Sequence, residues 1–230
     1  MTTDLWHCAL GQMPYGEALA LQQQLHAARR DGEVPDILLT LEHPPTYTRG
    51  RRSDDSELPM GEEWYRAQGI EIWKTDRGGR VTYHGPGQLV GYPIVSLRPL
   101  RDDVHRYIRI LEEALVASLG RHGVQATARE GLTGVWTLQQ RKIGSIGIHV
   151  SRGVTTHGFA VNVSNDLQPF EWIVPCGIEH CQVSSLTREK GTLKEVGPFA
   201  EVVTEELASA LGLQAIEVTP DQLGLLGKAA

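Results

Sequence analysis

Three segments of β character follow one another between residues 133 and 163, and only short polar breaks separate them. The segments are Thr133–Leu138, Lys142–Val150 and Val154–Val163, and each break spans three residues. Breaks of this length suit hairpins, because parallel strands need a crossover of roughly a dozen residues or more. We therefore expect an antiparallel meander in this part of the chain, which excludes a purely parallel sheet.

Three further segments carry apolar residues at the spacing of a helix. They span residues 14–32, 102–123 and 197–212, and the second opens on Asp102, a good N-cap residue. Strands that come in runs, with helices at intervals and no strict βαβ alternation, are typical of the α+β class. We predict a mixed β-sheet flanked by helices.

The length of 230 residues fits one large domain or two small ones. We expect a single domain over residues 1–230, which leaves room for a small helical C-terminal subdomain from about residue 198. Residues 50–64 are charged and irregular, and we expect an exposed loop there. Shorter apolar runs predict additional strands around Cys8 and at residues 37–41, 70–73, 89–97 and 171–174.

The composition limits the classes of protein that fit. Hydrophobic residues make up 40% of the chain and charged residues 22%, which is ordinary globular usage. The net charge of −6 argues against a nucleic-acid-binding protein. No apolar run reaches the roughly 18 residues of a membrane helix, and the first residues do not resemble a signal peptide. We expect a soluble, cytosolic protein that binds neither nucleic acid nor membrane.

The cysteines Cys8, Cys176 and Cys181 are too few for a disulfide framework and form no Cys-x-x-Cys pair. We expect Cys8 to pack inside a strand. Cys176 follows the strand predicted at residues 171–174 and stands between Pro and Gly. A nucleophilic thiol needs exposure and a partner that favours its thiolate, whereas a buried structural cysteine is the commoner case. The residues alone leave both interpretations open.

Residues 76–88 combine glycine and proline with interleaved Arg, Tyr and His side chains. Glycines permit close backbone approach and let N–H groups point at a ligand. A surface turn between two strands is the alternative. No Gly-Lys-Ser/Thr follows, so the segment is not a P-loop.

Lys142 opens a strand that otherwise holds small and aliphatic residues. Its side chain either extends to water, which is the commoner case, or is buried. Gly144 and Gly147 remove side chains from the same strand, which often marks the close approach of a ligand or of another backbone. His157 could be a base, a ligand or a core histidine, and the core role is the commonest for a single histidine.

Taken together and in order, these segments resemble the octanoyltransferases that use octanoyl-acyl carrier protein in lipoate biosynthesis. The resemblance covers about residues 4–212, and its departures are small: Val161 replaces the usual Leu and Ser184 the usual Thr. The matching motifs are Leu41-Glu42-His43-Pro44, Arg77-Gly78-Gly79-Arg80-Val81-Thr82-Tyr83-His84-Gly85-Pro86-Gly87-Gln88-Leu89, Lys142-Ile143-Gly144-Ser145-Ile146-Gly147, His157-Gly158-Phe159-Ala160 and Pro175-Cys176-Gly177-Ile178.

The resemblance implies the catalytic fold of biotin protein ligases and lipoate ligases, together with acyl transfer through a covalent intermediate. Cys176 is the implied nucleophile, and Lys142 is the implied partner that exchanges protons with the thiol and with the acceptor amine. A thioester donor is already activated, so the resemblance implies no cofactor, no ATP and no metal. Backbone N–H groups near Cys176 or in residues 77–79 are the expected donors to the oxyanion.

The implied partners are octanoyl-acyl carrier protein as donor, and lipoyl domains of 2-oxoacid dehydrogenases or the glycine-cleavage H protein as acceptors. Both kinds of partner are acidic, and Arg49, Arg51, Arg52 and Arg80 are expected to form the complementary face. The residues implied to bind the acyl group are Arg77, Gly78, Gly79, Arg80, Val81, Thr82, Tyr83, His84, Ser145, Ile146, Gly147, Gly158, Phe159 and Ala160.

Three other functions are weighed against this one. An ATP-dependent lipoate-protein ligase shares the fold and needs no cysteine. A metal site would use Cys176, His180 and Cys181, whose spacing matches no established pattern. A non-catalytic module that binds carrier proteins predicts neither a reactive thiol nor a transferred acyl group.

Overall fold

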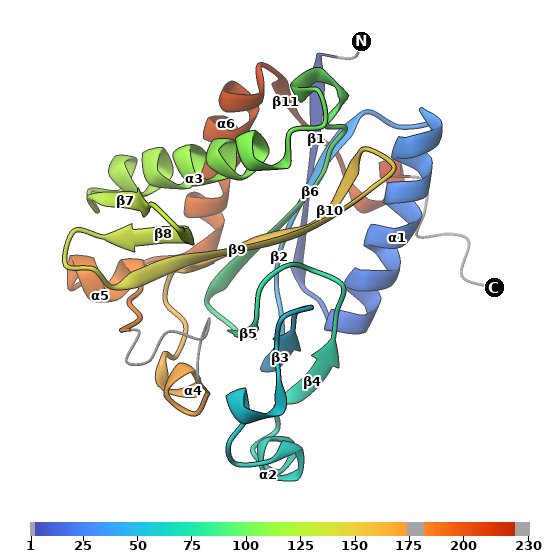
Figure 1. The fold of residues 1–230 in the computed structure, drawn as a ribbon. Coiled ribbons are helices and arrows are strands. Elements are labelled where there is room, and N and C mark those ends of the chain that lie inside the picture. The colour runs from blue at the N-terminus through green and yellow to red at the C-terminus, as the bar shows by residue number, and fades with distance from the viewer. Residues whose placement is uncertain (1–2, 174–181, 224–230) are drawn as a thin grey trace.

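The computed structural model describes residues 3–173 and 182–223, and within them the strands form one large and one small sheet (Figure 1). The large sheet is mixed, as the sequence predicts, because β1 pairs parallel with both neighbours while the other pairs are antiparallel. From one edge to the other its strands are β11 (Gln214–Glu217), β1 (Asp4–Gln12), β2 (Asp36–Glu42), β6 (Gln88–Ile94), β10 (Val154–Asn162), β9 (Lys142–Ser151), β8 (Leu132–Thr137) and β7 (Ala126–Arg129).

The predicted meander is confirmed as β8, β9 and β10, which pair antiparallel in sequence order. In this register Gly147 lies opposite Gly158, and Ile146 lies opposite Phe159. The meander therefore brings the motif that begins at Lys142 and the motif that begins at His157 onto neighbouring strands.

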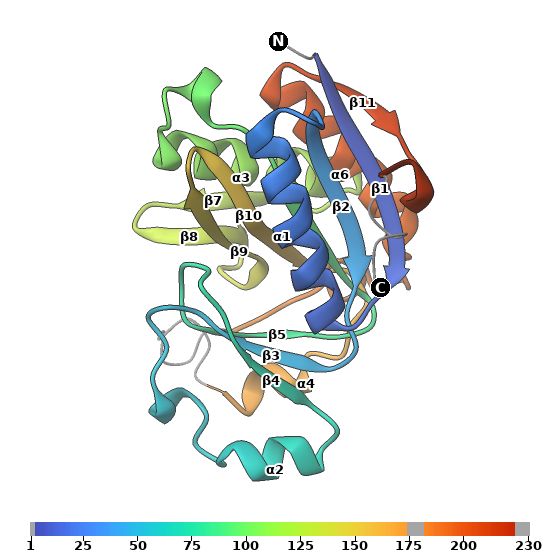
Figure 2. The ribbon, with the colours of Figure 1, turned by 90° about the vertical axis from the view of Figure 1, so that its right-hand side faces the viewer.

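Helices cover both faces of the large sheet, and Figure 2 shows α1 (Tyr15–Asp31) on one face with α3 (Val104–Arg121) and α6 (Val196–Leu211) on the other. Pro14 precedes α1, and Gly32 ends it in the left-handed conformation that glycine adopts without strain. The cap of α3 is Asp103 and not Asp102, because the Asp103 carboxylate accepts the N–H of Arg106 at 3.0 Å.

The small sheet lies beyond one end of the large sheet and consists of β4 (Glu71–Lys74), β3 (Thr46–Arg49) and β5 (Val81–His84) (Figure 2). Its own core contains Tyr47, Tyr83, Tyr65 of α2 (Glu62–Ala67) and Phe170 of α4 (Gln168–Glu171). The expected loop at residues 50–64 thus includes a 3-10 turn at Asp55–Glu57 and the start of α2.

The prediction of a strand at residues 171–174 is wrong for residues 171–173, which the structure describes. Residues 168–171 form α4, and Phe170 and Ile173 are both buried in the core of the small sheet. A separation of three residues puts two side chains on one face of a helical turn, whereas it puts them on opposite faces of a strand.

The segment of residues 198–217 packs into the main body of the protein. Phe199, Val203 and Leu207 of α6 share one apolar core with Leu111 and Leu115 of α3. β11 then pairs with β1, while α5 (Leu186–Lys190) precedes α6. None of the helices in the described ranges has the length and hydropathy of a membrane span.

Candidate active site

A cavity of about 460 Å³ lies against β9 and β10, where the chain between β4 and β5 meets them. Lys142 lines it, and so do all but one of the residues expected to bind an acyl group. The exception is Tyr83, whose ring packs against Tyr47 and Phe170 in the core of the small sheet. The expected residues in the lining are Arg77, Gly78, Gly79, Arg80, Val81, Thr82, His84, Ser145, Ile146, Gly147, Gly158, Phe159 and Ala160.

Arg77 fixes one wall of the cavity from within the protein, since it is only 8% exposed. Its Nη2 donates to the backbone carbonyl of Thr48 at 2.5 Å, its Nε donates to the Thr48 hydroxyl at 3.1 Å, and its Nη1 donates to the Gly78 carbonyl at 3.0 Å. The guanidinium therefore joins residues 77–79 to β3 of the small sheet.

The same loop touches the large sheet at Gly78 and Gly147. The Gly78 N–H donates to the Ile148 carbonyl at 2.9 Å, and a Cβ added at Gly147 would lie 2.9 Å from the Gly78 carbonyl oxygen. Of the two alternatives that the sequence left open for Gly147, a nearby ligand or a nearby backbone, the structure shows the backbone. Because the Gly78 N–H is already bonded, it does not serve as the oxyanion donor expected in this loop.

Lys142 is buried, so its side chain does not extend to water as the commoner case would have it. The residue is 5% exposed, and its Nζ lies 5.6 Å from the centroid of the Trp136 ring. A Cβ added at Gly134 would lie 3.1 Å from the Lys142 Cε, so the absence of a side chain there makes room for the lysine. The Lys142 N–H also donates to the Gln182 carbonyl at 2.8 Å.

Cys176, the residue expected to be the nucleophile, lies outside the described residues, as do His180 and Cys181 of the alternative metal site. Cys8 is fully buried in β1, and burial raises the pKa of its thiol to about 11. In the described part of the chain, no three His, Cys, Asp or Glu side chains gather in a way that could hold a metal ion.

His84 presents a neutral imidazole to the cavity. Its Nδ1 lies 2.8 Å from the Gln88 Oε1, which can only accept, so the hydrogen is on Nδ1 and Nε2 accepts from the Thr48 hydroxyl at 3.2 Å. Burial disfavours the charged form and, helped by the neighbouring His43, holds the pKa of His84 well below its usual range.

Sequence reasoning missed several residues around the cavity. Tyr15, Tyr92 and Trp136 line it, and the Tyr15 hydroxyl and Trp136 Nε1 are buried without a hydrogen-bond partner among the described residues. Asp76, whose carboxylate lies 2.7 Å from the His157 Nε2, was also missed. That contact lowers the Asp76 pKa to about 2. Tyr15 carried no signal beyond its place at the start of a helix, and Asp76 only its position beside Arg77.

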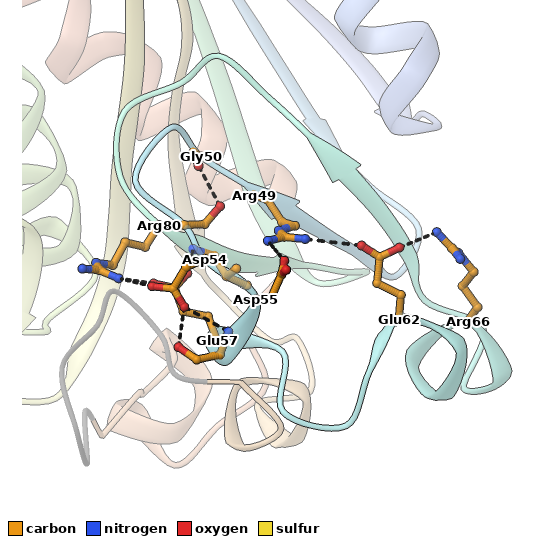
Figure 3. A network of polar contacts seen from close by, with 11 residues as sticks. Arg49, Gly50, Asp54, Asp55, Glu57, Glu62, Arg66 and Arg80 are labelled. Carbon is orange, nitrogen blue, oxygen red and sulfur yellow. Dashed lines mark hydrogen bonds and ion pairs between the residues drawn. The ribbon is translucent and has the colours of Figure 1, made fainter.

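Two of the arginines expected to form a docking face are held by carboxylates instead (Figure 3). Arg49 is 8% exposed, and its Nη2 and Nη1 lie 2.5 Å from Asp55 and 3.3 Å from Glu62. Arg80 Nη1 lies 2.5 Å from the buried Glu57. The expectation is therefore corrected for both, because their charges are largely neutralised within the protein.

Arg51 and Arg52 differ from these two in that their side chains are exposed and form no ion pair within the described ranges. Their backbones are fixed, since the Arg51 N–H donates to the Arg77 carbonyl and the Arg52 N–H to the Gly79 carbonyl, each at 3.0 Å. Arg52 also lines the cavity. The positive charge available at this edge of the cavity thus comes from these two side chains.

Comparisons with known proteins show the family of the chain. Residues 14–208 match the family model described as "Lipoyl protein ligase A/B catalytic domain". The chain is 50% identical to an octanoyltransferase of Rubrobacter xylanophilus over 85% of this chain and 86% of that one. It is 46% identical to an octanoyltransferase of Acidobacterium capsulatum, over 82% and 81% of the two chains.

Two groups of solved structures share the fold. The bipartite lipoate protein ligase of Thermoplasma acidophilum superposes with a TM-score of 0.73 at 18% identity, over 93% of this chain and 86% of the other. The biotin protein ligase of Aquifex aeolicus superposes with a TM-score of 0.51 at 11% identity, over 92% and 70%. At these identities the similarity establishes the fold alone, which is the one that the sequence predicted.

Proposed function

This chain belongs to the lipoyl protein ligase A/B catalytic domain family and, within it, to the octanoyltransferases, and we propose that it carries the octanoyl group as a thioester on Cys176. The donor is octanoyl-acyl carrier protein. The acceptor is the ε-amine of a lysine in a lipoyl domain of a 2-oxoacid dehydrogenase or in the glycine-cleavage H protein.

The chemistry consists of two acyl transfers. The Cys176 thiolate attacks the carbonyl carbon of the donor thioester, and the carrier leaves as a thiolate that takes up a proton. The acceptor amine then attacks the enzyme thioester, an amide forms, and the Cys176 thiol is restored with the proton that the amine loses. Because a thioester is already activated, neither step needs ATP.

Lys142 is the proposed proton carrier for both transfers. It takes the thiol proton of Cys176, delivers it to the departing carrier thiolate, and later accepts the proton of the incoming lysine. Its burial at the cavity beside Trp136 supports this role, since it holds the amine in a defined place away from bulk water.

The observation that carries the proposal is the coincidence of this buried lysine with an acyl-sized cavity. The volume of about 460 Å³ lies within the range of small-molecule sites, about 300–1,000 Å³. Val81, Ile146 and Phe159 contribute apolar surface to the lining, which suits a hydrocarbon chain.

The exposed Arg51 and Arg52 support the proposal that the partners are acidic proteins. Opposite charge speeds the encounter of two proteins and fixes their orientation more than it adds affinity. Since Arg52 lines the cavity, a carrier held at these residues lies next to the route by which its acyl group enters.

The test is the intact mass of the protein after incubation with octanoyl-acyl carrier protein in the absence of ATP. We expect a mass increase of one octanoyl group that disappears when a lipoyl domain is added, while the lipoyl domain gains the same group. Cys176→Ser should form no such adduct, whereas Cys8→Ser and Cys181→Ser should form it.

The ligase and the non-catalytic module each predict a different result in this experiment. An ATP-dependent ligase would modify the lipoyl domain only with free octanoate and ATP, and with no adduct on the enzyme. A non-catalytic module would bind the carrier protein and leave both masses unchanged.

A further inference from the structure

We propose that Asp76 and His157 are positioning residues whose side-chain hydrogen bond keeps the loop of residues 76–80 closed over the cavity and so keeps water away from the bound acyl group. The proposal rests on the proposed function, because it concerns the fate of the acyl-enzyme. It goes further by assigning a role to a pair of side chains that take no part in the two acyl transfers.

The pair joins two distant parts of the chain. Asp76 Oδ1 lies 2.7 Å from the His157 Nε2, and its Oδ2 lies 3.5 Å from the His149 Nε2. The His157 side chain is 3% exposed, whereas that of Asp76 is 52% exposed. The carboxylate thus reaches from the solvent-facing start of the loop to a histidine anchored in β10.

The backbone of His157 is unusual for a residue inside a strand. Its φ of 57° lies in the left-handed region, which residues other than glycine seldom adopt. The N–H of His157 donates to the Oε1 of Gln22 at 2.7 Å, and Gln22 is fully buried on α1. A conformation of this kind persists only where its surroundings determine it, and such residues concentrate at functional sites.

A second attachment of the loop lies at the same place on the sheet. The Gly78 N–H donates to the carbonyl of Ile148, and Ile148 is the residue of β9 that pairs with His157. The loop is thus tied to β10 through Asp76 and to β9 through Gly78, only two residues later.

The tied segment is the part of the loop that lines the cavity and holds the backbones of the exposed Arg51 and Arg52. Gly78 and Gly79 form its wall, and the Arg77 and Gly79 carbonyls hold the backbones of Arg51 and Arg52. Loss of the Asp76–His157 contact would therefore remove one of the ties that hold this wall of the cavity, beside those of Arg77 and Gly78, and let water reach the thioester, which hydrolyses instead of transferring.

The experiment compares the fate of the acyl-enzyme in the wild type, Asp76→Asn, His157→Asn and the double variant. The acyl-enzyme is formed with octanoyl-acyl carrier protein and freed of donor, and its decay is then followed by intact mass with and without lipoyl domain. Asparagine is chosen at residue 157 because it tolerates the left-handed backbone. Asp31→Asn removes an exposed carboxylate of the Arg30–Asp31 pair on α1 and is the matched control.

We expect Asp76→Asn to raise the rate of hydrolysis roughly tenfold relative to transfer, because a neutral amide oxygen is a weaker acceptor for the His157 N–H than the Asp76 carboxylate. The double variant should be no worse than the single variants, because they weaken or remove the same contact. In a second measurement, hydrogen exchange of the Gly78 amide should speed up in Asp76→Asn. Asp31→Asn should match the wild type in both.

The proposal fails if folded Asp76→Asn and His157→Asn keep the wild-type ratio of hydrolysis to transfer, or if the Gly78 amide exchanges at the wild-type rate in Asp76→Asn. A purely structural role would instead lower the melting temperature without changing that ratio, and so would also overturn it. If the wild type itself forms no acyl-enzyme, the failure lies with the proposed function and not with the role of this pair.

Discussion

The Nζ of Lys142 lies 5.6 Å from the centroid of the Trp136 ring, and both side chains are buried at the same cavity. An indole face is a favourable neighbour for an ammonium group. Together with Gly134, whose missing side chain leaves space beside the Lys142 Cε, Trp136 fixes where the amine lies. The site is therefore built for a lysine in a defined place and not for positive charge alone.

Lys142→Arg should abolish acyl transfer almost as fully as Lys142→Ala, although arginine keeps the charge. Guanidinium stays protonated at any working pH and cannot exchange protons, and the space beside Gly134 is shaped for a narrower side chain. Transfer to a lipoyl domain and the alkylation rate of Cys176 against pH should be measured for both variants. Near-normal transfer by Lys142→Arg would show that charge alone suffices.

Arg51→Glu and Arg52→Glu should each raise the KM for octanoyl-acyl carrier protein roughly tenfold, through lost electrostatic attraction to an acidic partner. The KM for a small octanoyl thioester should stay within about twofold, since these charges act on the carrier and not on the chemistry. Steady-state kinetics with both donors, at low and high salt, measures this. Arg30→Glu, which changes the net charge equally on exposed α1 surface, should leave both KM values unchanged. Equal losses with the two donors would assign the arginines to the cavity itself.

Arg49→Glu should affect stability instead of docking. The residue is buried, and a glutamate in its place would face Asp55 and Glu62 with like charge. We expect a loss of about 2–4 kcal/mol in the free energy of unfolding, the scale of an unpaired buried charge. Urea denaturation measures it, and a value equal to that of the wild type would contradict the buried ion pairs.

His43 should make the protein less stable at moderately acidic pH. Its Nδ1 donates to the Met13 carbonyl and its Nε2 accepts from the Tyr92 hydroxyl, each at 2.7 Å, so the folded state holds it neutral. Burial lowers its pKa from 6.5 to about 4. The unfolded chain therefore binds the proton first, and the contribution of His43 is complete above pH 6.5 and falls as the pH drops to 4.

The size of this loss is about 3 kcal/mol, since one unit of pKa difference corresponds to about 1.4 kcal/mol. The free energy of unfolding, measured by denaturant between pH 4 and 8, should slope less steeply in His43→Phe than in the wild type. Identical slopes would mean that His43 is already protonated, or solvated, in the folded protein.

Gly158→Ala should destabilise the protein by about 2–4 kcal/mol, the cost of forcing a methyl group into a closed contact. A Cβ there would lie 2.2 Å from the Gly91 carbonyl oxygen and 2.4 Å from the Pro93 Cδ, and neither atom can move freely. Gly78→Ala is the matched comparison, because its Cβ would meet nothing closer than the Ile148 oxygen at 3.5 Å. Chemical denaturation should separate the two, and equal stability would contradict the close approach of β6 and β10.

Elements with local signals could be predicted from the sequence. Pro14 and Gly32 mark the two ends of α1 in the sequence, and short polar breaks mark the turns of the meander. The four-residue strands β3, β5 and β11 were not predicted, because no local sequence pattern distinguishes them from loops. They form strands through pairing with partners elsewhere in the chain, and β11 is fully exposed, so it shows no alternation of buried and exposed residues.

The site too could be predicted only in part, because the residue types are visible in the sequence while their contacts are with residues far away in it. The glycines, Lys142 and His157 stood out by type and order, but their surroundings come from remote residues. The contact of His157 with Asp76 spans 81 positions, and the burial of Lys142 depends on Trp136 and on the backbone of Gln182. The arginines were misjudged for this reason, because only the folded chain puts Asp55, Glu57 and Glu62 beside them.

The place of β1 between β2 and β11 has a consequence for synthesis on the ribosome. One neighbour of β1, the strand β2, emerges soon after it, whereas the other, β11, follows every other described strand of this sheet. The side chains of His7 and Glu217, 210 positions apart, meet across the pair of β1 and β11. During translation β1 therefore presents an open strand edge until residues 214–217 have emerged. An open edge of this kind favours pairing with other nascent chains, so the late pairing of β11 with β1 removes this hazard.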